Sequence, residues 1–273
     1  MTISLVEGAR AFGVELTPAQ HDAFETYYRE LVVWNARVNL TAITARDDVI
    51  VKHFLDSLSV VPMLHRLVIA RSNLSGATIS VAESKVRDEA ISESRGDCFA
   101  PLAMTMRLID IGAGAGFPGL PLKIALPHLR LTLLEATGKK VAFLKHIIAQ
   151  RDLRDAVAIQ ARAEDLARDA AHCAQYDVAV ARAVAHLATL LEYALPFVRQ
   201  GGVFIAQKGV DVAAETCAAA RALELLGGRV REVAPVQLPG LEPRRLIVVE
   251  KIAATPDKYP RRAGIPERKP LTD

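Results

Sequence analysis

The chain has 273 residues, 51% of them hydrophobic, which is enough to bury one large core and excludes disorder throughout. Lys and Arg number 34 against 31 Asp and Glu, and the net charge of +3 by itself singles out no partner. The 3 cysteines are far apart and form no C-x-x-C pair, so we expect neither a disulfide framework nor a metal site. Charged residues interrupt the N-terminus and no stretch reaches the roughly 18 uncharged residues of a membrane span, so we expect a cytoplasmic protein that does not enter a membrane.

Residues 1–70 predict a helical N-terminal extension. Thr17, Pro18 and Gln20 form a capping box with Pro at the first helical position, which begins a helix. The apolar residues that follow recur every three or four positions and predict a buried stripe: Phe24, Tyr27, Tyr28, Leu31, Val32 and Leu40. A second helix is predicted through "DDVIVKHFLDSLSVVPML", capped by Asp47 or Asp48.

The rest of the chain changes character twice. Residues 71–106 mix Ser, Gly and charge without a sustained period and predict a partly disordered surface insertion. Residues 107–252 alternate short β-forming runs with helical stretches, which predicts a parallel sheet with helices on both faces. The last two runs, "RVREVAPVQL" and "RRLIVVEKI", are joined only by a short turn and should pair antiparallel. The predicted fold is therefore α/β of the class I methyltransferase type: a Rossmann-like, seven-stranded, mostly parallel sheet with a terminal antiparallel hairpin.

The first strand of this domain ends in a glycine loop, "GAGAGFPG". Gly112, Gly114 and Gly116 let the backbone pass close under a nucleoside. A shifted frame would read as the G-x-G-x-x-G of a dinucleotide site, but Pro118 lacks the N–H that a pyrophosphate needs at the first helical turn. Asp110, just before the loop, adds a negative charge that suits a cationic ligand such as S-adenosylmethionine.

Two further acidic residues, Glu135 and Glu164, lie at or just after the ends of predicted strands. Glu135 ends the second strand, where a carboxylate can accept hydrogen bonds from both ribose hydroxyls. Ala163 and Glu164 follow the third strand, in a place to contact an adenine, although Glu164 would serve equally well as an acid at a helix start.

Eight ordered motifs from about residue 20 to the C-terminus, the insertion apart, resemble the RsmG (GidB, glucose-inhibited division protein B) family. That family comprises bacterial methyltransferases that modify guanine N7 in the 530 loop of 16S rRNA. The motifs are "WNARVNLTAI", "VKHFLDSL", "IDIGAGAGFPGLPLKI", "LLEATGKKVAFLKHI", "ARAEDL", "VARAVAHL", "QKG" and "KYPRRAGIPERKPL".

The resemblance implies S-adenosylmethionine as cofactor, with Glu135 at the ribose. Its other implied contacts are Gly112, Phe117, Ala163, Glu164 and Arg182. Arg182 has a structural alternative, an ion pair with Asp177 or Glu192.

The resemblance also implies a substrate side to the site. It places Arg162, Lys208 and Arg244 near the RNA, and His53, Asp56 and Ser57 at the mouth of the pocket. We take His53, Asp56 and Lys208 as candidate catalytic residues, with a purely structural histidine as the alternative for His53. Guanine N7 carries a lone pair and no proton, so the expected reaction is direct displacement without a covalent enzyme intermediate.

Residues 253–273 predict a basic C-terminal tail. Its segment "KYPRRAGIPERK" holds five basic residues and one acid, which accounts for the whole excess of positive charge. We expect it to contact the partner, 16S rRNA or the small ribosomal subunit, through Arg261, Arg262, Arg268 and Lys269, the alternative being a merely solvated tail. An NAD-dependent oxidoreductase and a non-catalytic ribosome-binding protein remain as other functions, and we expect a monomer.

Overall fold

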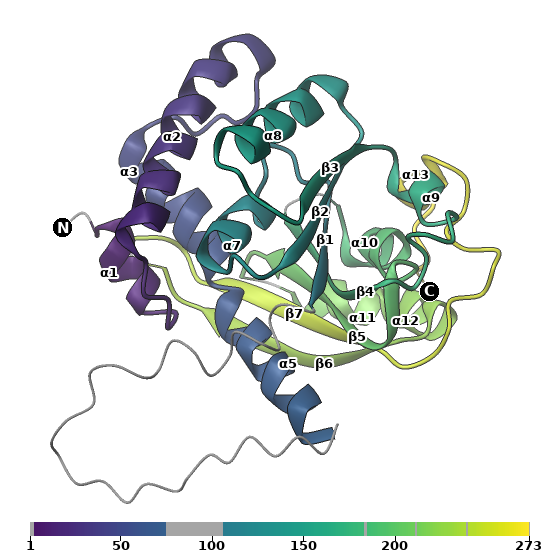
Figure 1. The fold of residues 1–273 in the computed structure, drawn as a ribbon. Helices are drawn as coiled ribbons and strands as arrows, with labels where there is room; N and C mark the ends of the chain where they lie inside the picture. The colour runs from purple at the N-terminus through teal and green to yellow at the C-terminus, as the bar shows by residue number, and fades with distance from the viewer. Residues whose placement is uncertain (1–2, 75–105, 183–184, 211, 239, 273) are drawn as a thin grey trace, which may run out of the picture.

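A computed structural model describes residues 3–74, 106–182, 185–210, 212–238 and 240–272. These residues form a seven-stranded sheet with helices on both faces (Figure 1). The strands are β1 (Arg107–Ile111), β2 (Arg130–Glu135), β3 (Ala156–Gln160), β4 (Tyr176–Arg182), β5 (Val198–Lys208), β6 (Gly228–Val236) and β7 (Arg244–Lys251). Their order is β3-β2-β1-β4-β5-β7-β6, with β7 antiparallel to β5 and β6 and the other neighbours parallel. The predicted class I methyltransferase fold with its terminal hairpin is confirmed.

Helices form the N-terminal part of the chain: α1 (Leu5–Arg10), α2 (Pro18–Val38), α3 (Arg46–Val49), η1 (Ile50–Leu55), α4 (Asp56–Leu58) and α5 (Val61–Leu74). The capping box at the start of α2 is confirmed, since Thr17 and Gln20 each accept a hydrogen bond from the other's backbone N–H. The predicted cap by Asp47 or Asp48 is wrong. Helix α3 begins at Arg46, after Ala45, so both aspartates lie in its first turn, where their charge still favours the helix N-terminus.

The second predicted helix is interrupted by a π-helical segment. In η1 the backbone N–H groups reach carbonyls five residues back instead of four, so the turn holds one extra residue. This segment contains His53 and leads directly into Asp56 at the start of α4.

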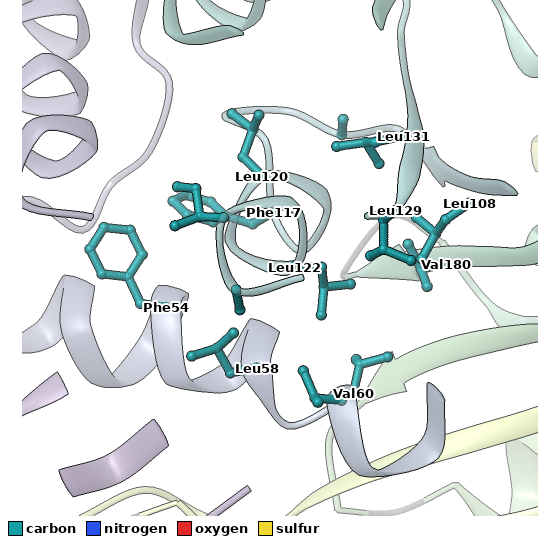
Figure 2. Packing of buried hydrophobic residues seen from close by; sticks show 14 of the residues in the cluster. Phe54, Leu58, Val60, Leu108, Phe117, Leu120, Leu122, Leu129, Leu131 and Val180 are labelled. Carbon is teal, nitrogen blue, oxygen red and sulfur yellow. The ribbon is translucent and has the colours of Figure 1, made fainter. Parts of the chain in front are cut away.

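Each face of the sheet has its own core, because alternate residues of a strand point to opposite faces. One core joins the sheet to the N-terminal helices and to α7 (Gly119–Ala125) and α8 (Gly138–Gln150). Figure 2 shows part of it, in which Phe54 and Leu58 face Phe117 and Leu122. The second core lies under α10 (Leu187–Ala194) and α12 (Ala220–Leu226) on the other face. The N-terminal extension is therefore part of the main core.

Other helices are short: α9 (Ala163–Leu166), α11 (Ala213–Ala218) and α13 (Ile265–Arg268). The expected insertion coincides largely with residues 75–105, which lie outside the described residues, whereas α5 continues past residue 70 to Leu74. Val32 was expected in the buried stripe of α2 but is 37% exposed, because the stripe is narrower than predicted. None of the helices in the described ranges is long and apolar enough to cross a membrane.

Candidate functional site

The glycine loop connects β1 to α7, and the N–H groups of Gly112 and Ala113 donate to the Leu134 carbonyl near the end of β2. Gly114 and Gly116 have φ of +60° and +99°, a left-handed conformation that favours glycine. The Gly114 N–H donates to Oε2 of Glu135 at 3.0 Å, and the Thr137 N–H donates to Oε1 of the same carboxylate at 2.8 Å. Glu135 is therefore held by two backbone donors at the carboxyl edge of the sheet, beside the loop.

Asp110 lies under the same loop and is fully buried. Its Oδ2 accepts a hydrogen bond from the Gly119 N–H at 2.8 Å, whereas its Oδ1 is buried with no hydrogen-bond partner among the described residues. Burial raises the pKa of Asp110 to about 7. The Gly119 N–H is the first of α7, so the protein's own carboxylate occupies the donor that a pyrophosphate would need. This occupancy argues against a dinucleotide site.

A second cluster forms where η1 meets the end of β4. The Arg182 guanidinium donates from Nη1 to Oδ2 of Asp56 at 2.9 Å and to the Lys52 carbonyl at 3.0 Å. Its Nη2 lies 3.2 Å from Nδ1 of His53. The guanidinium also lies 5.0 Å from the ring centroid of Phe117, on which the His53 ring stacks at 4.4 Å. The structure thus brings together Arg182, His53, Asp56 and Phe117 as expected, and pairs Arg182 with Asp56 instead of Asp177 or Glu192.

His53 in this cluster is a neutral ring with both nitrogens engaged. Nδ1 lies 3.2 Å from Nη2 of Arg182 and 3.1 Å from the Lys52 carbonyl, and Nε2 lies 2.9 Å from the Thr41 hydroxyl. Burial, together with the positive charge of Arg182, lowers the pKa of His53 to about 4. His53 therefore supports Arg182 and is poorly placed to remove a proton from a substrate.

Two basic residues near this cluster, Arg244 and Lys208, have different contacts. Arg244, at the start of β7, has its Nε 4.0 Å from Oδ1 of Asp56, and its side chain is 41% exposed. Lys208, at the end of β5, instead donates to Glu215 of α11 at 2.6 Å and to the Ala185 carbonyl at 2.5 Å. Arg244 therefore borders the Asp56 cluster, whereas the contacts recorded for Lys208 fasten the segment before α10.

The basic tail is folded onto the domain instead of projecting from it. The Arg261 guanidinium forms a forked ion pair with Glu192 of α10, whose side chain is fully buried. Glu164 accepts a hydrogen bond from the Gly264 N–H at 2.8 Å. These contacts engage the guanidinium of Arg261, which we had expected at RNA. The side chains expected at RNA that stay exposed in the tail are those of Arg262, Arg268 and Lys269.

Two contributors to the site escaped the sequence analysis. Tyr27 of α2 is fully buried and donates from its hydroxyl to the carbonyl of Ala115, within the glycine loop, at 2.5 Å. Gln207 of β5 donates from Nε2 to the carbonyl of Asp56 at 2.8 Å. Tyr27 was correctly predicted as a core residue, but no spacing in the sequence indicates which carbonyl its hydroxyl reaches.

A hollow in the surface lies apart from this edge of the sheet. A hollow of 570 Å³ lies near the start of β5 and the end of β7, and its lining includes Cys173, Lys251 and Tyr259. None of the predicted site residues lines it. Across the described ranges, no three His, Cys, Asp or Glu side chains gather as a metal-binding group.

Comparison with known proteins identifies close relatives of the chain. The GidB family model, described as rRNA small subunit methyltransferase G, matches residues 20–70 and 97–245. The chain is 48% identical to "Ribosomal RNA small subunit methyltransferase G" of Roseiflexus sp. (strain RS-1), over 98% of each chain. It is 45% identical to the protein of that name from Dehalococcoides mccartyi (strain CBDB1), again over 98% of each. The protein of that name from Acetivibrio thermocellus is 40% identical, over 98% of this chain and 96% of the relative.

Proposed function

This chain belongs to the rRNA small subunit methyltransferase G family, and we propose that it methylates N7 of a guanine in the 530 loop of 16S rRNA, with S-adenosylmethionine as donor. The observation that carries the proposal is the glycine loop with a held carboxylate on one side, Glu135, and a buried carboxylate beneath it, Asp110. This arrangement fits one nucleoside with a positive charge and leaves no helix N–H for a pyrophosphate.

The residues present fit the cofactor. Each oxygen of Glu135 accepts one backbone hydrogen bond and keeps a lone pair for a ribose hydroxyl. Oδ1 of Asp110 has no hydrogen-bond partner among the residues that the structure describes and so can accept from a bound ligand. When bound, S-adenosylmethionine supplies an electrophilic methyl group. The residues that we propose to hold it are Asp110, Gly112, Gly114, Gly116, Phe117, Glu135, Ala163, Glu164 and Arg182.

The cluster around Arg182 shapes the acceptor side. Asp56 is almost fully buried. One of its carboxylate oxygens forms an ion pair with Arg182, and Arg244 lies next to the other oxygen. Guanine N7 has a lone pair and no proton, so no side chain has to act as a base. The neutral, fully engaged ring of His53 agrees with this. We propose that His53 and Asp56 orient Arg182 and align the acceptor base, and that Lys208 acts indirectly by fixing the segment before α10.

For the RNA contact we propose the exposed basic residues around this edge of the sheet. They are Arg162, Arg244, Arg262, Arg268 and Lys269. Phosphate contacts by such residues release counterions, so binding should weaken steeply with salt. We propose 16S rRNA within the small subunit as the substrate of a monomeric cytoplasmic enzyme.

The test is methyl transfer from labelled S-adenosylmethionine to small subunits that lack the modification, followed by mapping of the labelled base. We expect one labelled guanine in the 530 loop, with the label on N7. The matched control is Glu135→Ala, which should raise the cofactor Kd about tenfold, equivalent to about 1.4 kcal/mol. Label at another base would contradict the proposed target. Thermal stabilisation by NAD, with none by S-adenosylmethionine or S-adenosylhomocysteine, would contradict the reaction class.

A further inference from the structure

The C-terminal tail reaches the edge of the sheet at which we place the cofactor. Several of its contacts fasten residues 260–269 to α9 and α10 or to the segment next to them. The Arg168 side chain donates to the carbonyl of Pro260 at 2.6 Å, and the Thr189 hydroxyl donates to that of Pro266 at 3.1 Å. Pro260 and Pro266 are both buried, so this part of the tail packs as a folded element.

The strongest of these contacts is the ion pair between Arg261 and Glu192. Nε of Arg261 lies 2.9 Å from Oε1 and 3.1 Å from Oε2, and Nη2 lies 2.6 Å from Oε2. The backbone N–H of Arg261 adds a fourth hydrogen bond to the same carboxylate at 2.7 Å. Because the Glu192 side chain is fully buried, its charge needs this partner. Arg261 is thereby fixed in position by α10.

Three residues further on, the tail touches a residue of the cofactor site directly. The Gly264 N–H donates to Oε1 of Glu164, in the segment that follows β3. Gly264 has a φ of +77°, the left-handed conformation that favours glycine and begins α13 there. Glu164 is 4% exposed, so the donor from the tail fixes the direction of a nearly buried carboxylate. Its other oxygen keeps its capacity to accept a hydrogen bond.

We infer that residues 260–269 form one wall of the cofactor site, in which Arg261 is a positioning residue that holds the Gly264 N–H on Glu164. The inference rests on the proposed function, because Glu164 meets a nucleoside only if the chain binds S-adenosylmethionine. It divides the tail into two roles. Arg261 and Gly264 serve the cofactor, and the exposed side chains of Arg262, Arg268 and Lys269 are left for RNA.

The experiment measures the Kd of S-adenosylhomocysteine by isothermal titration calorimetry, without RNA and without turnover. We expect Arg261→Ala to raise this Kd at least tenfold. The matched control is Lys258→Ala, which removes the same charge from an exposed tail residue outside the wall and should change the Kd less than twofold. Hydrogen exchange gives a second measure: S-adenosylhomocysteine should slow amide exchange of residues 260–269 in the wild-type protein.

A second variant covers the case in which Arg261→Ala fails to fold around an unpaired buried carboxylate. The double variant Glu192→Gln with Arg261→Gln removes both charges together and should show the same rise in Kd. A purely structural pair would lower the melting temperature and leave the Kd unchanged. Wild-type affinity in the folded double variant would therefore overturn the inference and leave the proposed function standing. Failure of the wild-type protein to bind S-adenosylhomocysteine would overturn the proposed function, and the inference with it.

Discussion

Asp110→Asn should stabilise the cofactor-free protein at pH 8 and weaken its binding of S-adenosylmethionine. Burial raises the pKa of Asp110 to about 7 in the folded protein, from an ordinary value of 3.8. Between these two pH values the folded state holds a proton that the unfolded state has lost. The contribution of Asp110 to stability is therefore fully present below about pH 3.8 and declines as pH rises towards 7.

The size of the effect follows from the same shift. About three pH units at about 1.4 kcal/mol each give an upper bound of about 4 kcal/mol for the penalty of the ionised group. The Asn side chain keeps an oxygen for the Gly119 N–H but places an amide donor where Oδ1 has no partner, which costs about 1–3 kcal/mol. We therefore expect a net stabilisation of about 1–3 kcal/mol at pH 8.

Urea unfolding of both proteins at pH 5 and pH 8, without cofactor, gives the comparison. The stability difference between Asn and Asp should be larger at pH 8 than at pH 5. Asp48→Asn, at a half-exposed carboxylate on the protein surface, is the matched control and should show no such pattern. Identical pH dependence of Asp110→Asn and wild type would refute the reasoning on titration. An unchanged Kd for S-adenosylmethionine would remove Asp110 from the cofactor site.

Two further predictions concern contacts within the site. Tyr27→Phe leaves the buried carbonyl of Ala115 without its donor and should cost about 1–3 kcal/mol, whereas Tyr28→Phe loses only a 3.3 Å bond at the surface and should cost under about 0.5 kcal/mol. Thermal melts compare the pair, and equal losses would contradict the role of the Tyr27 hydroxyl. Arg182→Ala leaves the nearly buried carboxylate of Asp56 without its ion-pair partner and should lower the free energy of unfolding in urea by about 3–5 kcal/mol. Arg182→Lys should recover part of that loss, because the positive charge remains, but not all of it, because lysine lacks the two-pronged guanidinium. A loss of stability below about 1 kcal/mol in the Ala variant would argue against the buried pair.

The local pattern of the sequence predicts the sheet well. The strands are marked by β-forming runs such as "RLIDI" and "YDVAVAR", which coincide with β1 and β4. The capping box of α2 is likewise written in adjacent residues, Thr17 to Gln20. The cap of α3 was mispredicted because α3 begins after Ala45, a residue that supplies no side-chain cap and gives no helix-start signal.

Long-range pairing is what local pattern leaves undetermined. Arg261 and Glu192 are far apart in the sequence, and a basic residue in a basic tail predicts an RNA contact until its buried partner is known. The partners of Arg182 and Tyr27 pose the same difficulty, since both are set by how the N-terminal helices pack on the sheet. The glycine loop and Glu135 could be found because a nucleoside site places them at strand ends, which the sequence does mark.

The extra residue in η1 makes chain length itself a determinant of the site. Helical residues are about 100° apart around the helix axis, so deleting one residue between Lys52 and Asp56 would change the direction of one contact relative to the other. Arg182 holds both the Lys52 carbonyl, inside η1, and the carboxylate of Asp56, just after it, and this requires the present register. Deleting Leu55, which lies between these two contacts, would remove neither contact residue and would still shorten the spacing between them by one residue. In related sequences, a gap at this point would therefore indicate a changed site more clearly than a substitution would.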